Sequence, residues 1–187
     1  MNRQSQDKNT VGGDLVGRDK NVVNVKVGTQ SLISRLNDQY LQEAELGRPI
    51  KQNLEDLQHY MARSTDSDVR GLKEKLEAAN RSDLLNYAER LKEKAYKRIM
   101  EYQTSPTAQK IFEFSLLKLL TTYQLEVWPL ILEGSSRPAV DERISGLLNK
   151  CYSLLEANEL GLQEEDLLGL LFFLGGNCHL RWENTKC

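Results

Sequence analysis

The sequence predicts a mostly α-helical protein, a bundle of six or seven helices with a short N-terminal β-strand or hairpin arm. From residue 29 onward, apolar residues recur every three or four positions, which is the spacing of amphipathic helices. The chain has only four prolines, so few positions interrupt these helices. Residues 1–28 are instead rich in glycine, valine, asparagine and aspartate. We therefore divide the chain into a partly disordered arm, residues 1–28, and a helical domain, residues 29–187.

The arm contains a loose five-residue repeat and a strand pattern. Val11-Gly-Gly-Asp-Leu is followed by Val16-Gly-Arg-Asp-Lys, and valines then alternate with Asn24 and Lys26. The Gly-Asp steps are typical of turns, and alternating β-branched and polar residues are typical of a strand. Because one or two short strands cannot bury an apolar face alone, the arm must dock on the helices, stay mobile or pair with other copies. The residues expected to mediate pairing are Asp14, Val16, Gly17, Arg18, Asp19, Val23, Val25 and Val27.

Four helices are predicted in the first half of the helical domain. One runs from about Leu32 to Gly47, and another begins near Pro49. A polar break at 64–67 precedes a short helix from about Gly71. Ser82 or Asp83 is expected to cap the fourth and longer helix. Its apolar stripe is Leu84, Tyr87, Ala88, Leu91, Ala95, Ile99 and Tyr102.

The second half is predicted to hold the most buried helix. Ser105-Pro106 is typical of a helix start, and the residues after it are apolar almost all round, so this helix is expected to be central. Pro129 should kink or restart it. After a loop at 133–138, a single-faced helix extends from about 140 to 155. The last helix should run from about Glu164 to Leu174 and stop at Gly175-Gly176.

Composition predicts a soluble cytoplasmic protein. The formal net charge is −2, which gives no overall attraction to nucleic acid or to an anionic membrane. The first thirty residues have no apolar signal-peptide core, and the longest apolar run, Leu167–Leu174, is too short to span a membrane. Three cysteines, an odd number, indicate reduced thiols; they are Cys151, Cys178 and Cys187.

The adjacent pair Cys178-His179 allows two interpretations. A histidine can activate a cysteine nucleophile, but neighbouring residues rarely point toward each other and no third orienting group is evident. In the favoured interpretation, the two glycines turn the chain, Leu180 and Trp182 pack back on the bundle, Cys178 is buried and His179 is hydrogen-bonded. No paired Cys/His spacing typical of zinc sites occurs, even with His59 included.

The other motifs do not predict a catalytic site either. Lys20 lacks the spacing and the following helix of a phosphate-binding loop. The helix from Arg90 to Arg98 carries several cations, but glutamates interleave with them, so a solvated face is favoured and nucleic-acid binding is the alternative. The acids 164–166 complement the dipole of the last helix. The sequence therefore predicts a non-enzymatic binding module with no catalytic residue, metal or cofactor.

Several stretches together resemble one bacterial family, the helical C-terminal domain of ABC three-component conflict systems. The resemblance runs from about residue 30 to 182, and its most specific part ends in Asn-Cys-His-Leu-Arg-Trp. The family usually has threonine where Gly175 stands, a departure expected to loosen the turn without changing the fold. The signature residues are Asn177, Cys178, His179, Arg181 and Trp182. The matching stretches are 69–77, 86–94, 105–111, 128–131 and 173–182.

The resemblance implies an adaptor of an anti-phage or anti-plasmid defence system. In such systems this domain is expected to link variable N-terminal effectors to an SMC-like ABC ATPase and a small middle component. The arm, Gly-Asp-Leu-Val-Gly-Arg-Asp-Lys, resembles motifs found beside signalling and effector domains of bacterial conflict proteins. Because no effector enzyme domain is recognised, either the chain is a minimal adaptor whose arm drives self-assembly, or the effector is a separate chain.

Overall fold

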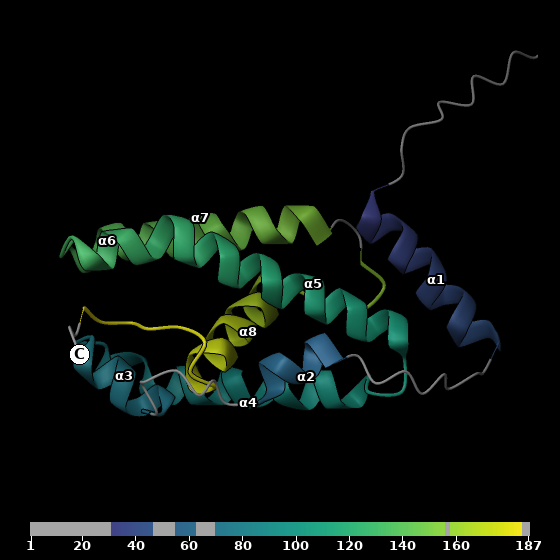
Figure 1. Ribbon diagram of the computed structural model, residues 1–187, viewed down its shortest axis with the longest axis horizontal. Coiled ribbons are helices and arrows are strands. Elements are labelled where there is room, and N and C mark those ends of the chain that lie inside the picture. Colours follow the sequence, from purple (N-terminus) through teal and green to yellow (C-terminus); the bar gives the residue numbers. More distant parts are fainter. Residues whose placement is uncertain (1–30, 47–54, 63–69, 156–157, 185–187) are drawn as a thin grey trace, which may run out of the picture.

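A computed structural model describes residues 31–46, 55–62, 70–155 and 158–184 of the chain (Figure 1). These residues are mostly helical and contain no strand, which confirms the helical class; the predicted β arm lies outside them. The helices are α1 (Leu32–Leu46), α2 (Glu55–Met61), α3 (Leu72–Ala78), α4 (Leu85–Glu101), α5 (Pro106–Thr122), α6 (Trp128–Leu132), α7 (Arg137–Leu155) and α8 (Glu164–Gly176). A 3-10 turn (Ser82–Leu84) precedes α4, and a π-helical turn (Tyr123–Val127) joins α5 to α6.

The segments from Pro106 to Leu132 are contiguous and form one helical rod. Counted with this rod as a single unit, the described part of the chain has seven helices, within the predicted range. The rod begins as expected: Ser105 Oγ accepts a hydrogen bond from the Ala108 backbone N–H at 3.1 Å, and Pro106 is the first helical residue. Near Pro129 the rod restarts as α6 after the π turn, as the proline predicted.

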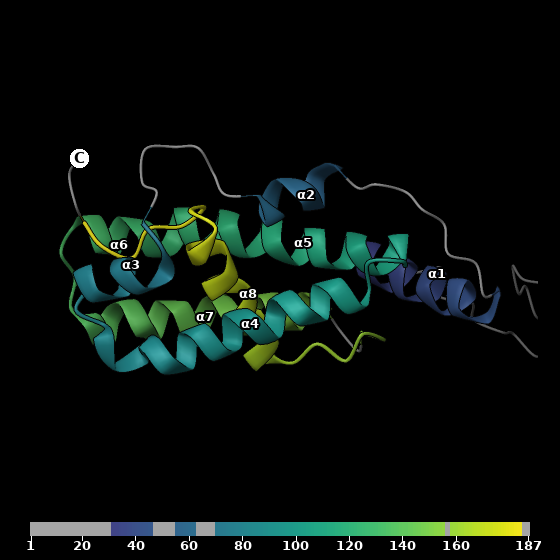
Figure 2. The same cartoon turned by 90° about the horizontal axis from the view of Figure 1, so that it is seen from below.

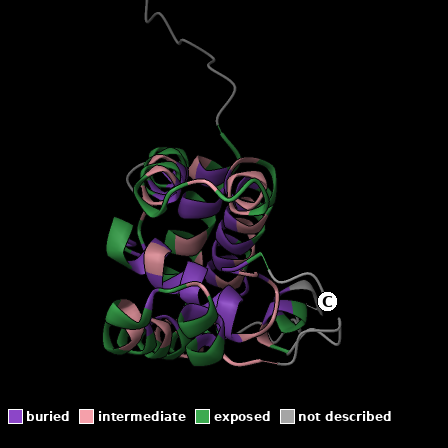
Figure 3. Cartoon of the chain, turned by 90° about the vertical axis from the view of Figure 1, so that its left-hand side faces the viewer, coloured by how far each residue is buried: buried purple, intermediate pink, exposed green. Residues whose placement is uncertain are grey.

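Helix α8 lies at the centre of the bundle. It contacts α3, α4, α5 and α7, and nearly all of its residues from Asp166 to Gly176 are buried. In Figure 1, α5 and α7 run along one side of α8 and α4 along the other. In Figure 3, the ribbon segments coloured as buried gather toward the middle of the bundle, and the exposed segments lie at its outside. Helix α5, predicted to be central, also contacts several neighbours, but α8 is the more completely covered.

The close approach of α8 to α4 depends on small residues. A Cβ atom placed on Gly169 would lie 2.8 Å from the backbone oxygen of Leu91. Ala88 and Ala95 are also buried on this face of α4. The backbones of the two helices can therefore meet closely only because Gly169 has no side chain.

Helices α1 and α2 lie outside this centre. Figure 2 shows α2 along the outer side of α5 and α1 near the end where α5 begins, and both helices contact α5. Helix α1 buries only Ile33, Leu36 and Asn37. No helix in the described ranges is both long and apolar enough to cross a membrane.

Two details of the predicted long helix were wrong. Helix α4 starts at Leu85 with no side-chain cap, because Ser82 and Asp83 lie in the preceding 3-10 turn and the Asp83 carboxylate accepts bonds from Arg137 at 2.8 and 2.7 Å. Tyr87, expected in the buried stripe, is exposed, and the Arg90 guanidinium lies 5.4 Å from its ring centroid. An exposed cation–π contact explains an aromatic side chain at this surface position.

Candidate functional site at the end of helix α8

The last turn of α8 contains Gly175 and Gly176, and the signature residues begin directly after it, at Asn177. We predicted that Gly175 and Gly176 would stop the helix; instead both are helical, and Asn177 is the C-cap. The chain reverses one residue later, at Cys178, whose φ of 66° lies in the left-handed region. The His179 backbone N–H then donates to Leu174 O at 2.9 Å and closes the turn.

The two glycines are explained by close packing rather than by turn geometry. A Cβ atom on Gly175 would lie 2.6 Å from Trp182 Nε1, and one on Gly176 would lie 3.0 Å from Lys92 Cδ. The expectation that Gly175 loosens the turn stays a prediction, and the contact with Trp182 is a separate reason for glycine at this position. The Trp182 indole occupies the space that a side chain at position 175 would need.

Residues 177–184, which we call the C-terminal strap, run back over the bundle. Leu180 and Trp182 are almost fully buried. The Trp182 ring stacks on Phe172 with 5.5 Å between centroids and meets Tyr123 edge-on at 5.8 Å. The Arg81 guanidinium, also buried, lies 5.9 Å from the Trp182 centroid. The indole is thus enclosed by two aromatic rings and a cation, while its buried Nε1 has no hydrogen-bond partner among the described residues.

A buried lysine ties the strap to α3 and α8. Lys75 has no exposed surface, and its Nζ donates to Gly175 O at 3.1 Å and to Leu180 O at 3.0 Å. A buried ammonium group is costly unless it is hydrogen-bonded, so these carbonyls and the lysine depend on one another. No motif in the sequence singled out Lys75. Its signal was position: Lys75 shares one helix face with Leu72 and Leu76 at i+3 and i+4 spacing.

Further polar contacts fasten the rest of the strap. Tyr123 Oη donates to Arg181 O at 2.7 Å, and burial raises the pKa of this phenol far above its ordinary value. Glu183, which is buried, pairs with Arg70. At the two ends of the strap, Asn177 Nδ2 donates to Tyr60 O at 2.9 Å and Asn184 Nδ2 to Leu132 O at 2.8 Å. The strap therefore joins α2, α3, α6, α8 and the π turn.

Cys178 and His179 contact separate backbone carbonyls. Cys178 Sγ lies 3.6 Å from Arg70 O, and the side chain is half-buried rather than fully buried as predicted, because it sits at the surface turn. His179 Nε2 lies 3.2 Å from Ala62 O. Its ring is 5.2 Å from that of His59, and burial together with this second histidine lowers the pKa of His179. The arrangement holds α2 against the strap and differs from a thiol–imidazole pair.

The basic face of α4 is neutralised by carboxylates. Lys97 pairs with Glu93 at 2.6 Å, and Lys92 pairs with Glu89 at 3.1 Å. Lys94 and Arg98 both reach the start of α8, where Asp166 accepts from each of them at 3.1 and 2.7 Å. Arg90 lies over the Tyr87 ring, and the other four cations from Lys92 to Arg98 are paired with carboxylates, which leaves less positive charge for phosphate contacts and disfavours the nucleic-acid alternative.

Asp166, expected only to complement the helix dipole, also takes part in a capping box at the start of α8. Its Oδ2 accepts from the Gln163 backbone N–H at 2.9 Å. Burial acts to raise the pKa of Asp166, but the Gln163 bond and the pairs with Lys94 and Arg98 outweigh it, so the pKa is lowered. The carboxylate is therefore held in its charged form by structural contacts.

The remaining candidate residues do not assemble into a metal centre. Among the described residues, no three His, Cys, Asp or Glu side chains are grouped closely enough to hold an ion. Burial of Cys151 in α7 raises the pKa of its thiol to about 11, so it is poorly nucleophilic. Cys187 lies outside the described residues. So do the predicted oligomerisation residues Asp14, Val16, Gly17, Arg18, Asp19, Val23, Val25 and Val27.

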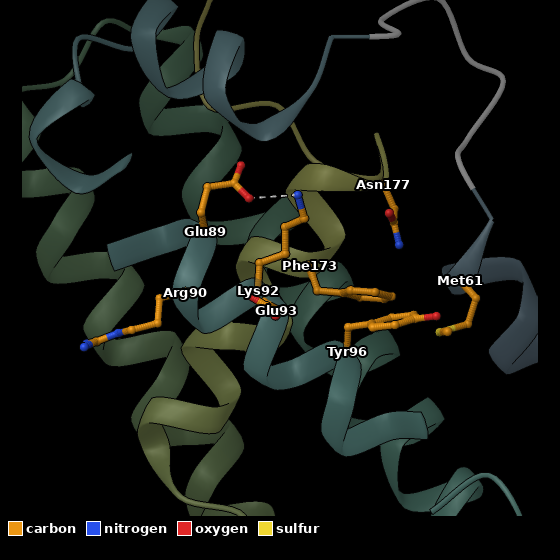
Figure 4. Close-up of a pocket in the computed structure, with 8 residues that line it drawn as sticks. All are labelled: Met61, Glu89, Arg90, Lys92, Glu93, Tyr96, Phe173 and Asn177. Atoms are coloured by element: carbon orange, nitrogen blue, oxygen red, sulfur yellow. Dashed lines mark hydrogen bonds and ion pairs between the residues drawn. The ribbon is translucent and has the colours of Figure 1, made fainter. Parts of the chain in front are cut away.

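A groove of about 560 Å³ opens beside the strap, between α2, α4 and the end of α8. Figure 4 shows the rings of Phe173 and Tyr96 lying together, with Met61 and Asn177 turned toward them. The other lining residues are Glu89, Arg90, Lys92 and Glu93. No sequence pattern indicated this groove, since Met61 comes from a helix far from the other lining residues in the chain.

Comparison with known proteins gives a family for the region that contains the strap and most of the groove. Searches of curated proteins and of solved structures gave no match. The family model for C-terminal domain 9 of the ABC-three component systems matches residues 71–182, more than half of the chain. This range includes α3 to α8 and the strap as far as Trp182. The chain therefore belongs to the family of C-terminal domains of ABC three-component systems.

Proposed function

We propose that the protein is a non-enzymatic adaptor and assembly component of a bacterial anti-phage or anti-plasmid system. As a C-terminal domain of an ABC three-component system, it has the other components as partners. In the proposal, the helical domain binds the SMC-like ABC ATPase and the small middle component. The N-terminal arm joins copies of this chain to one another.

The proposal is supported by the contacts that the signature residues make. Asn177, Cys178 and His179 each contact a backbone carbonyl of the segment between α2 and α3 or of α2 itself. Trp182 is buried in the core and stacks on Phe172. Asn177, Cys178 and His179 are of types that often take part in catalysis. Because they hold the strap in place instead, they support a binding scaffold rather than a catalyst.

The partner-binding part is tested by co-expression. The tagged chain would be produced with the ATPase and middle component encoded beside it, and the complex measured by affinity capture and size-exclusion chromatography. A stoichiometric complex with either component is expected. A folded chain that captures neither would contradict the proposal.

The self-assembly part is tested by deleting residues 1–28. We expect the molar mass measured by light scattering to fall to that of a smaller assembly, because strands without a partner cannot bury their apolar face. Circular dichroism of the deletion variant is the control for helical folding. An unchanged molar mass would remove the arm from the assembly interface.

A further inference from the structure

Helix α2 keeps its place through contacts with α5 and with the strap. It has seven residues, and a helix of that length is not stable alone in water, so its position depends on what it packs against. Leu57 and Tyr60 are buried, and α5 lies beside them (Figure 2). On the strap side, Asn177 Nδ2 donates to Tyr60 O at 2.9 Å. Weakening the strap contact should therefore shift α2 toward release.

Two histidines, the only two in the chain, meet across this strap contact. His59 is exposed on α2, His179 is half-buried on the strap, and their ring centroids are 5.2 Å apart. The Tyr60 ring lies 5.4 Å from His59 and 5.6 Å from His179. When both imidazoles are protonated, two like charges face each other between α2 and the strap, and like charges at this distance repel.

The hydrogen bond of His179 is retained on protonation. A carbonyl can only accept, so His179 Nε2 donates to Ala62 O, 3.2 Å away, and Nδ1 is the nitrogen that takes up a proton in acid. Nε2 donates in the neutral and in the charged form. The effect of acid on the contact therefore comes from the added positive charge and not from a lost hydrogen bond.

The surroundings of His179 oppose that added charge. Burial lowers the pKa of His179, and the positive charges of His59 on α2 and of Lys75 on α3 lower it further. The backbone hydrogen bonds with Ala62 and Tyr60 act in the opposite direction but are outweighed. Lys75 has no exposed surface, so its charge is poorly screened by water. Acid thus places a second cation where one is already buried.

The acidic residues of the two segments do not favour the docked state in acid. Glu183, the one acidic residue of the strap, pairs with Arg70, and the other charged strap residue, Arg181, is a cation. The acids at 55–56, which begin α2, move with His59, so they act alike in the docked and released states. The positive charges therefore decide how this contact responds to pH.

We infer that the contact between His59 and His179 is a pH-sensitive switch, which holds α2 on the strap near neutral pH and releases it in acid. Release uncovers Leu57 and Tyr60, and it removes Met61 from the groove between α2, α4 and the end of α8. The switch goes beyond the proposed function and does not depend on it, since it is a property of the chain alone.

The direction and the pH range follow from the lowered pKa of His179. A histidine whose pKa is lower in the docked state binds fewer protons there, so its stabilising contribution is complete above the ordinary value, about 6.5. The contribution is lost as the pH falls from that value through the lower docked value. Asp166 remains charged over this range, because its own pKa is lowered from an ordinary carboxyl value.

The test is hydrogen exchange of the full-length chain near pH 7.5 and near pH 5, with rates corrected for the intrinsic effect of pH. We expect the protection of α2 amides to fall by about threefold or more, while α8 amides keep theirs. His179→Gln should remove most of this fall, and His59→Gln should reduce it. Gln58→His is the matched control: it adds a histidine at an exposed neighbouring position of α2 and should leave the fall as in the wild type.

A proton NMR titration of the two imidazoles gives a second readout. His179 should titrate below pH 6.5, and His59→Gln should move its midpoint upward, because one facing charge is removed. A residue with a purely structural role would not produce that shift. His59 is exposed, so His59→Gln is expected to fold and decides the question even where His179→Gln does not fold.

Four results would overturn the switch. They are equal protection of α2 at the two pH values, an equal loss in α2 and α8, absence of α2 protection at pH 7.5, and a fall of wild-type size in both glutamine variants. Each is measured on the isolated chain. The proposed adaptor function is decided separately by capture of the other components, so the two can fail independently.

Discussion

The two ends of the bundle are held together in different ways. At the strap end, apolar packing and buried hydrogen bonds occur together. Trp182 packs among aromatic rings, and Lys75 and Tyr123 donate hydrogen bonds to carbonyls of the strap. At the other end, α1 rests on α5 through three buried residues and through Glu43, which accepts from Ser105 and Thr107. Leu32, Leu41 and Leu46 of α1 remain 50%, 43% and 66% exposed.

This difference coincides with the limits of the family match. The match begins at residue 71, so the strap end is inside it, whereas α1 and α2 are outside. The part shared with the family forms a core with its own closing network. Helix α1, outside the match, leaves three leucines exposed, although Leu125 inside the match is 72% exposed as well. The contrast is therefore one between the buried network at the strap and the lightly buried α1, and four substitutions test how large it is.

The largest effect is expected for Trp182→Ala. The variant empties a space between Phe172, Tyr123 and Arg81, so the free energy of unfolding should fall by about 3–5 kcal/mol in urea titrations. Trp128→Ala is the matched control, because Trp128 is only partly buried and should cost less. A melting temperature that Trp182→Ala leaves unchanged would instead point to a partner-binding role for residues 175–182.

Gly175→Ala should be the next most destabilising substitution, at about 1–3 kcal/mol, because the new Cβ would overlap Trp182 Nε1. Gly146→Ala in α7 is the control with the opposite sign. No atom lies within 4 Å of a Cβ at that position, so alanine should stabilise the helix by about 0.5–1 kcal/mol. Thermal melts of both variants measure the difference. Equal effects of the two substitutions would show that helix propensity alone is involved.

Asp166 should make stability depend on acid. Because its pKa is lowered in the folded chain, its contribution is complete above the ordinary carboxyl pKa, about 3.9, and is lost as the pH falls through the lower folded value. Asp166→Asn should cost about 1–2 kcal/mol at pH 7 through the weakened cap and ion pairs. Its unfolding free energy should also vary less than that of the wild type below pH 4. Parallel pH profiles for the two proteins would exclude this carboxylate as a source of acid sensitivity.

The smallest effect is expected on α1. Leu46→Ser replaces a side chain that is already 66% exposed, so the free energy of unfolding should change by less than about 0.5 kcal/mol. Chemical denaturation at two protein concentrations provides the measurement. A loss above about 1 kcal/mol would mean that this face is covered in the free protein, and the contrast between the two ends would then be weaker.

Capping and periodicity predicted those helix starts and buried faces that depend on residues close together in the sequence. The Ser105 cap, the start of α8 at 164–166 and the buried stripe from Val140 to Leu155 each depend on neighbouring residues, and the structure has all three. One stripe position was wrong: Leu154 is 44% exposed. Helical class and approximate boundaries follow from such rules because periodicity and capping act within a few residues.

The candidate site could not be predicted, because it is formed by contacts between residues far apart in the sequence. Gly175 looks like a helix terminator until Trp182 is placed against it, seven residues away. Lys75 stands among charged neighbours and looks solvated, although its carbonyl partners are 100 and 105 residues distant. Met61 and Tyr96 form one groove from two helices. Each of these depends on which helices meet, and a single sequence does not specify that by periodicity.

The buried ammonium of Lys75 also sets an order of events during synthesis. Helix α3 leaves the ribosome long before Gly175 and Leu180, which accept its hydrogen bonds, have been translated. Until then these two hydrogen bonds cannot form, so the strap end of the bundle stays incomplete around α3. A nascent chain interrupted before residue 175 should therefore remain open to proteases, and only chains translated through the strap should accumulate in the cell.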